Sequence, residues 1–144
     1  MKKILIIIAI GFFCFNANSQ KWINRAYYSE MEISGIFSNY ATTDSKLRVV
    51  LQKKVKNIEI YLYEYNGTNP VKSYSYKYYK LSITDDLGKN HKFFGCMYSN
   101  SIILNKSNTK KLNKLMESNR SLYVFIYEAK YFINNYSFYI RNEK

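Results

Sequence analysis

The chain has 144 residues, enough for one domain with its own hydrophobic core, and 22 basic against 10 acidic side chains give it a formal net charge of +12. Two cysteines and one histidine exclude a disulfide-rich scaffold and are too few for the four ligands of a usual zinc site. Glycine-rich phosphate loops and nucleotide-binding motifs do not occur, so no cofactor is expected.

The N-terminus has the three parts of a bacterial-type secretory signal peptide. Lys2 and Lys3 precede an uncharged apolar run over residues 4–15, and small residues precede an expected cleavage site after Ser19. The run is shorter than the roughly 20 residues that a bilayer-spanning helix needs. We therefore expect removal of residues 1–19, which leaves residues 20–144 as a single β-rich domain, secreted or periplasmic, without a stable membrane span.

A lipid anchor on Cys14 is the alternative, although the bulky Phe13 stands where such a site normally has a small residue. Removal of residues 1–19 takes away two basic and no acidic side chains, which leaves a formal charge of +10. A charge of this size favours an anionic partner, but a general bias toward lysine, asparagine, isoleucine and tyrosine also accounts for it. Export argues against nucleic acid as the partner.

The residue pattern typical of strands is weak at first and becomes clearer further along the chain. Residues 22–45 predict one or two short strands that end in a loop over Asn39–Ser45. Leu47–Gln52 is rich in β-branched and aliphatic residues and predicts a strand, which a turn at Lys53–Lys54 would end. Val55–Tyr65 then alternates with the period of two that is typical of a sheet strand, with its apolar face formed by Ile58, Ile60 and Leu62.

A hairpin is predicted in the middle of the chain. Ser73–Thr84 alternates, with Tyr79, Leu81 and Ile83 on its apolar face. Asp85–Gly88 has the composition of a turn, Phe93–Tyr98 would complete the hairpin, and Ser101–Leu104 predicts a further short strand. The single histidine, His91, falls in the turn region and is expected to be solvated.

One short helix is predicted near residues 108–118. Ser107 or Asn108 could cap it, Asn119 could end it, and a narrow apolar stripe would face the sheet. The stripe consists of Leu112, Leu115 and Met116.

Two strands follow the helix. Ser121–Glu128 is apolar at every position from Leu122 to Tyr127, which predicts a central strand covered on both sides. Residues 129–135 predict a connector before a last strand lined by Tyr136, Phe138 and Ile140. The fold class is therefore mainly β, a small antiparallel sandwich or partly open barrel of about seven to eight strands with one helix.

Tyrosines supply the candidate binding residues. If Val55–Tyr65 and Ser73–Thr84 pair as a hairpin centred near Asn69 and Pro70, six tyrosines form one cross-strand ladder with a lysine beside it. Tyrosine suits a binding face because its large rigid ring loses little entropy on contact, although such a ladder can also be purely structural. The candidate residues are Tyr61, Tyr63, Tyr65, Tyr74, Tyr76, Tyr78 and Lys77.

The sequence contains few candidate catalytic residues. Glu30 and Glu32 would share one face of a strand, which is weak support for a carboxylate-dependent hydrolase. Cys96 is alone once Cys14 is removed, and its apolar neighbours favour a buried thiol over a reactive or intermolecularly paired one. We expect a non-enzymatic binding module of the cell envelope that recognises a protein, a glycan or an anionic polymer. A small hydrolase acting on envelope polymers and a structural or assembly subunit are the alternatives.

Overall fold

Antiparallel strands account for most of the fold. The computed structural model describes residues 20–39, 42–64, 69–70, 73–99, 101–128 and 134–142, so the expected signal peptide lies outside the described residues. The strands and the helix are β1 (Ile23–Asn24), β2 (Ser29–Asn39), β3 (Thr42–Lys53), β4 (Ile58–Glu64), β5 (Asn69–Pro70), β6 (Ser73–Thr84), β7 (Asn90–Ser99), β8 (Ser101–Leu104), α2 (Lys106–Ser118), β9 (Ser121–Glu128) and β10 (Asn134–Arg141).

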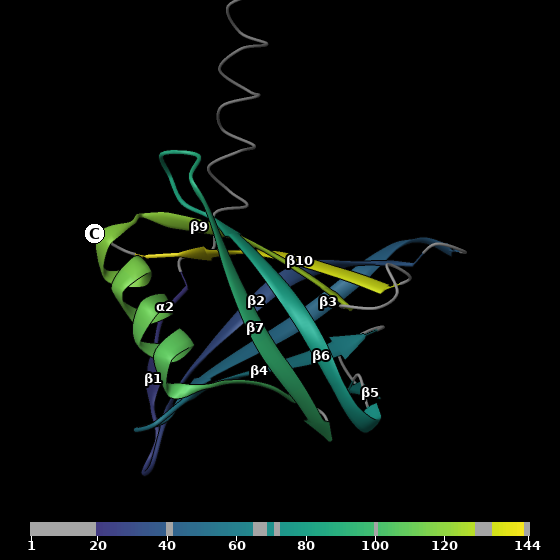
Figure 1. The fold of residues 1–144 in the computed structure, drawn as a ribbon, viewed down its shortest axis with the longest axis horizontal. Helices are drawn as coiled ribbons and strands as arrows, with labels where there is room; N and C mark the ends of the chain where they lie inside the picture. The colour runs from purple at the N-terminus through teal and green to yellow at the C-terminus, as the bar shows by residue number, and fades with distance from the viewer. Residues whose placement is uncertain are drawn as a thin grey trace, which may run out of the picture.

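Eight of these strands close into a barrel (Figure 1). The hydrogen-bonded order is β2-β10-β9-β6-β7-β8-β4-β3, and β3 pairs again with β2 to complete the ring. The two-residue strands lie outside the ring, β1 on β2 and β5 on β4. The predicted mainly-β fold with one helix is confirmed.

Two long connections set the strand order. The chain leaves β4 and enters β6 three places further around the ring, so that β8 and β7 lie between them. Helix α2 then carries the chain from β8 back to β9, which pairs with β6. The predicted β4–β6 hairpin is therefore wrong. Period-two alternation determines which face of a strand is apolar, but it carries no information about which strand lies alongside.

The barrel interior is filled by the apolar face of each strand. Ile58, Ile60 and Leu62 of β4 are at most 1% exposed, as are Leu81 and Ile83 of β6. An eight-stranded barrel has an interior just wide enough for its own side chains, so a packed core is the expected result. The predicted inward faces of β4, β6 and β10 are confirmed.

Glycines allow two close approaches inside the barrel. A Cβ atom at Gly35 would lie 2.5 Å from the Ser137 carbonyl oxygen and 3.0 Å from the Phe138 Cβ atom. A Cβ atom at Gly95 would likewise overlap the Ile102 Cγ2 atom. Real Cβ contacts are not that short. β10 can therefore pack this closely against β2, and β8 against β7, only where the chain has glycine.

Helix α2 covers one end of the barrel (Figure 1). Its Leu112 and Met116 side chains are buried, and Leu115 packs partly buried against the core. The buried Thr109 hydroxyl accepts a hydrogen bond from the Ile58 backbone N–H at 3.0 Å and donates one to the Leu104 carbonyl oxygen at 3.2 Å. None of the described helices is long and apolar enough to cross a membrane.

The helix begins earlier than the sequence indicates. Asn105, not Ser107 or Asn108, is the N-cap, and its side-chain oxygen accepts the Asn108 backbone N–H at 2.8 Å. Several consecutive polar residues could each cap this helix, so the sequence alone does not select among them. The predicted C-cap, Asn119, is confirmed.

The N-terminal half contains more strand than predicted. β2 runs through Asn39 and pairs with β3 from Thr42 onward, so the expected loop over Asn39–Ser45 is wrong. Polar residues continue these strands because alternate side chains of a barrel strand point outward. β4 begins only at Ile58, because the chain turns where the Lys54 N–H donates to the Asn57 carbonyl oxygen at 2.9 Å.

Candidate binding surface

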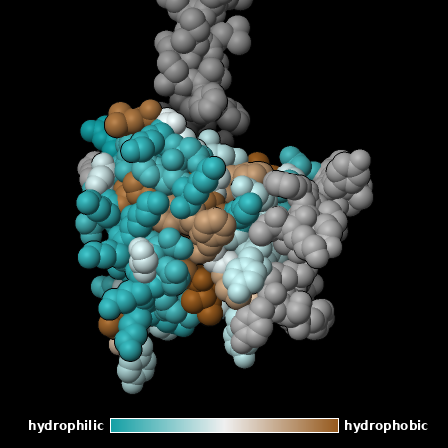
Figure 2. All heavy atoms as spheres, in the orientation of Figure 1, coloured by the Kyte–Doolittle hydropathy of each residue, from teal (hydrophilic) through white to brown (hydrophobic). Residues whose placement is uncertain are grey.

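Aromatic side chains gather on the outside of four neighbouring strands, β10, β9, β6 and β7. Alternate residues of these strands fill the core, so the intervening residues point away from the barrel. We call the aromatic ones the outer aromatic face, and they are Tyr78, Phe94, Tyr98, Tyr123, Phe125, Tyr127 and Tyr139. Figure 2 shows hydrophobic and near-neutral residues beside the strongly hydrophilic surface of α2.

Strand register brings these rings into contact. Tyr123 of β9 is directly opposite Tyr139 of β10, and their ring centroids are 4.9 Å apart. Phe125 and Tyr127 follow on the same side of β9, with centroids 5.6 Å apart. The prediction that β9 is covered on both sides is therefore wrong, because its outward rings are only half-buried.

Much of this aromatic area is open to solvent. Tyr78 is 66% exposed, Phe94 56%, Tyr98 56% and Tyr139 48%. Single exposed hydrophobic residues are ordinary, but neighbouring ones on adjacent strands are typical of interaction surfaces.

Positive charges lie between the rings. Lys80 is directly opposite both Phe94 and Tyr127 in the strand register, and Lys92 is opposite Ser82. The Arg141 guanidinium lies over the Tyr139 ring, 5.6 Å from its centroid. Among the described side chains that point outward from these four strands, none is acidic. The outer aromatic face is therefore also a basic face.

A groove lies where β2 and β10 separate. Its volume is about 390 Å³, and it is lined by Ser34, Gly35, Ile36, Tyr123, Ser137, Phe138 and Tyr139. Strand pairing between β2 and β10 ends at Gly35 and Phe138. Beyond this point, the Gln20 carboxamide takes the place of a strand partner, donating to the Tyr139 carbonyl oxygen at 2.7 Å and accepting the Arg141 N–H at 2.9 Å.

The tyrosines that the sequence singled out do not form one ladder. Tyr61 of β4 is opposite Val50 and Ser101, and Tyr63 is opposite Arg48 and Pro70. Tyr78 of β6 is opposite Cys96 and belongs to the outer aromatic face. Tyr65 lies outside the described residues, and of Tyr74, Tyr76 and Lys77 the structure describes the backbone only.

Tyr61 belongs to a polar network with its own partners. Its hydroxyl donates to Glu59 Oε2 at 2.8 Å, and Lys54 Nζ lies 2.9 Å from the other oxygen of the same carboxylate. Burial first, and then the hydrogen bond to Glu59, raise the pKa of Tyr61 to about 12. The phenol is therefore protonated at neutral pH and acts here as a donor that stabilises the buried carboxylate.

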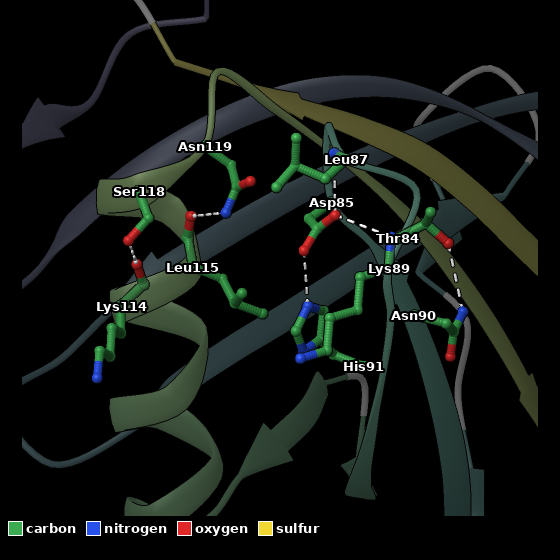
Figure 3. A network of polar contacts seen from close by, with 10 residues as sticks. All are labelled: Thr84, Asp85, Leu87, Lys89, Asn90, His91, Lys114, Leu115, Ser118 and Asn119. Atoms are coloured by element: carbon green, nitrogen blue, oxygen red, sulfur yellow. Dashed lines mark hydrogen bonds and ion pairs between the residues drawn. The ribbon is translucent and has the colours of Figure 1, made fainter.

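His91 is held in place, so the prediction of a solvated histidine is wrong (Figure 3). Its Nε2 atom lies 2.9 Å from Asp85 Oδ2, and Leu115 points from α2 toward the ring. Asp85 Oδ1 also accepts the Leu87 and Lys89 N–H groups. The hydrogen bond from His91, followed by those from the backbone, lowers the pKa of Asp85. A catalytic triad would need a nucleophile at the second ring nitrogen, and the described hydrogen bonds of His91 lead only to Asp85.

The two carboxylates expected for a hydrolase each form an ion pair with an arginine. Glu30 Oε1 lies 2.6 Å from Arg25 Nη2, and Glu32 Oε1 lies 2.9 Å from Arg48 Nε. Within the described ranges, no group of three metal-ligating side chains occurs. Cys96 is half-buried and points outward beside the exposed Tyr78, so the prediction of a buried thiol is wrong.

Comparisons with known proteins add no functional information. No family model matches the chain, and no curated protein and no solved structure shows significant similarity to it.

Proposed function

We propose that the protein is an exported, non-catalytic binding module of the cell envelope that holds an anionic polymer on its outer aromatic face. One observation carries the proposal. Partly exposed rings occupy four neighbouring strands together with Lys80, Lys92 and Arg141, and no described acidic side chain points outward among them. Aromatic rings provide rigid contact area, and the cations provide attraction over a longer range.

The barrel supports this function by holding the rings in fixed positions. Each outward ring is adjacent to inward residues such as Leu122, Val124 and Ile126, which are at most 1% exposed. A face whose backbone is fixed by a packed core loses little entropy when it binds, so more of the contact energy appears as affinity.

Closure of the β-barrel bears on the alternative that the protein is a structural subunit. Assembly by strand addition needs a long unpaired edge. Each of the eight barrel strands pairs on both sides, so within the described part of the chain only the two-residue β1 and β5 lie outside the closed ring. A face that binds a polymer is therefore better supported than an edge that adds a strand.

The proposal is tested with a charged and an uncharged form of the same polymer. The purified protein should bind carboxymethyl-dextran and should not bind unmodified dextran at the same concentration, as measured by biolayer interferometry. Binding should weaken as salt rises from low ionic strength to about 0.15 M, where the screening length is about 8 Å.

The aromatic contribution is separated from net charge by a matched pair of variants. Tyr78→Ser removes a ring on the outer aromatic face, and Tyr27→Ser removes a ring that is 89% exposed elsewhere on the molecule. We expect Tyr78→Ser to weaken binding of carboxymethyl-dextran several-fold and Tyr27→Ser to leave it unchanged. Equal effects of the two variants, or equal binding of both polymers, would overturn the proposal.

A further inference from the structure

The groove between β2 and β10 combines features of a saccharide site. Tyr123 and Tyr139 form an aromatic wall on one side, and Ser34 and Ser137 contribute hydroxyl groups. The volume of about 390 Å³ falls in the range of about 300–1,000 Å³ that is usual for small-molecule sites. Aromatic walls with a few placed polar groups suit a sugar ring, which presents C–H groups to the rings and hydroxyl groups to the serines.

A cation lies next to one of the residues that line this groove. Arg141 lies over Tyr139, a lining residue, and has no carboxylate partner among the described ion pairs. Guanidinium groups bind carboxylates through paired N–H donors, which gives geometric selectivity as well as attraction. The unit that fits the groove and also satisfies Arg141 is therefore a sugar that carries a carboxylate.

The position of the wall is fixed from the N-terminal side. Gln20 bonds to the backbone of both Tyr139 and Arg141, which fixes the stretch of β10 backbone that carries the ring and the cation. Gly35 allows the backbones of β2 and β10 to approach at the floor of the groove. These contacts give the groove a fixed shape before any ligand binds, and preorganisation of this kind favours affinity.

We propose that this groove is the subsite that binds one uronic acid unit of the polymer. Arg141 faces the carboxylate of that unit, and the aromatic ring of Tyr139 faces its sugar ring. The inference rests on the proposed function and makes it more specific. The remainder of the outer aromatic face then contacts the polymer through charge and ring area, whereas the groove recognises the sugar unit itself.

The test uses a short, defined oligomer of the proposed sugar unit. The probe is a tetramer of galacturonic acid, and its fully methyl-esterified form is the uncharged control. Binding to the protein is measured by isothermal titration calorimetry, and the binding position by backbone amide shifts in nuclear magnetic resonance. We expect the acid form to shift the amides of Ser34, Ser137 and Tyr139, and the ester to bind at least tenfold more weakly.

Matched cation variants separate the groove from the face. Arg141→Gln should weaken tetramer binding at least tenfold and lower binding of carboxymethyl-dextran only a few-fold. Lys92→Gln removes a cation from the face outside the groove and should weaken tetramer binding at most about twofold. Equal effects of the two variants on the tetramer, or shifts centred on Tyr78 and Phe94, would reject the subsite while leaving the proposed function intact. Binding of neither the polymer nor the tetramer would overturn both.

Discussion

Replacing Gly35 by alanine tests how tightly the barrel closes between β2 and β10. The added methyl group would lie 2.5 Å from the Ser137 carbonyl oxygen, where an ordinary contact needs roughly 3.4 Å or more, so one of the strands must move by nearly an ångström. Overpacking a tight core usually costs about 1–3 kcal/mol. Alanine also restricts the unfolded chain, which would stabilise the protein by about 0.4–1 kcal/mol at an unstrained site. Since the steric cost is larger, we expect a net loss of roughly 1–2 kcal/mol.

The free energy of unfolding is measured by urea titration, followed by far-ultraviolet circular dichroism. For a domain of this size the expected loss corresponds to a decrease in Tm of roughly 3–10 °C. Ser34→Ala is the control, because Ser34 is the adjacent residue on the same strand and points outward. A Gly35→Ala protein as stable as Ser34→Ala, or more stable than the parent, would refute the claim that β10 lies too close for a side chain there.

Three further predictions concern the helix and the β6–β7 turn. Thr109→Val leaves the Ile58 N–H buried without its acceptor and should cost about 1–3 kcal/mol of unfolding free energy, whereas Thr109→Ser keeps the hydroxyl and should cost less. Leu112→Ala should cost about 2–5 kcal/mol, and the exposed Lys114→Ala less than about 0.5 kcal/mol, both by urea titration. The lowered pKa of Asp85 stabilises the fold above its unfolded value of about 3.9, and this stabilisation is lost as pH falls through the lower folded value. Asp85→Asn should therefore lose less stability than the parent between about pH 5 and pH 2, and equal pH profiles would contradict the assigned role.

Local patterns in the sequence predicted much of the secondary structure. Ser101–Leu104 and Ser121–Glu128 are strands with the predicted bounds, because each is a short apolar stretch between polar residues. The Asp85–Gly88 turn follows from residue chemistry, since Gly88 has a φ angle of +81°, which other residues rarely adopt. Signals of this kind depend on neighbours in the chain and can be recognised without knowledge of the fold.

The candidate site could not be predicted in the same way, because it depends on which strands are adjacent. The spacing of the β4 tyrosines predicts a ladder shared with β6, but β8 and β3 are the neighbours of β4 in the barrel. The apolar residues on both faces of β9 predict that its rings are buried, and only a closed barrel shows that one of those faces is the outer surface. Gln20 and Arg141 are about 120 residues apart in the chain, and no local pattern links them.

The contact between Gln20 and β10 also has a chemical consequence. If cleavage occurs after Ser19, Gln20 becomes the N-terminal residue, and a free N-terminal glutamine can cyclise: its amine attacks the side-chain carbonyl carbon and ammonia is released. The resulting lactam lacks the primary amide whose N–H donates to the Tyr139 carbonyl oxygen. Folding therefore competes with lactam formation for the same carboxamide. A mature protein that folds promptly should keep its glutamine, whereas one that remains unfolded would age into a form in which β10 lacks this hydrogen-bond partner beyond the end of its pairing with β2.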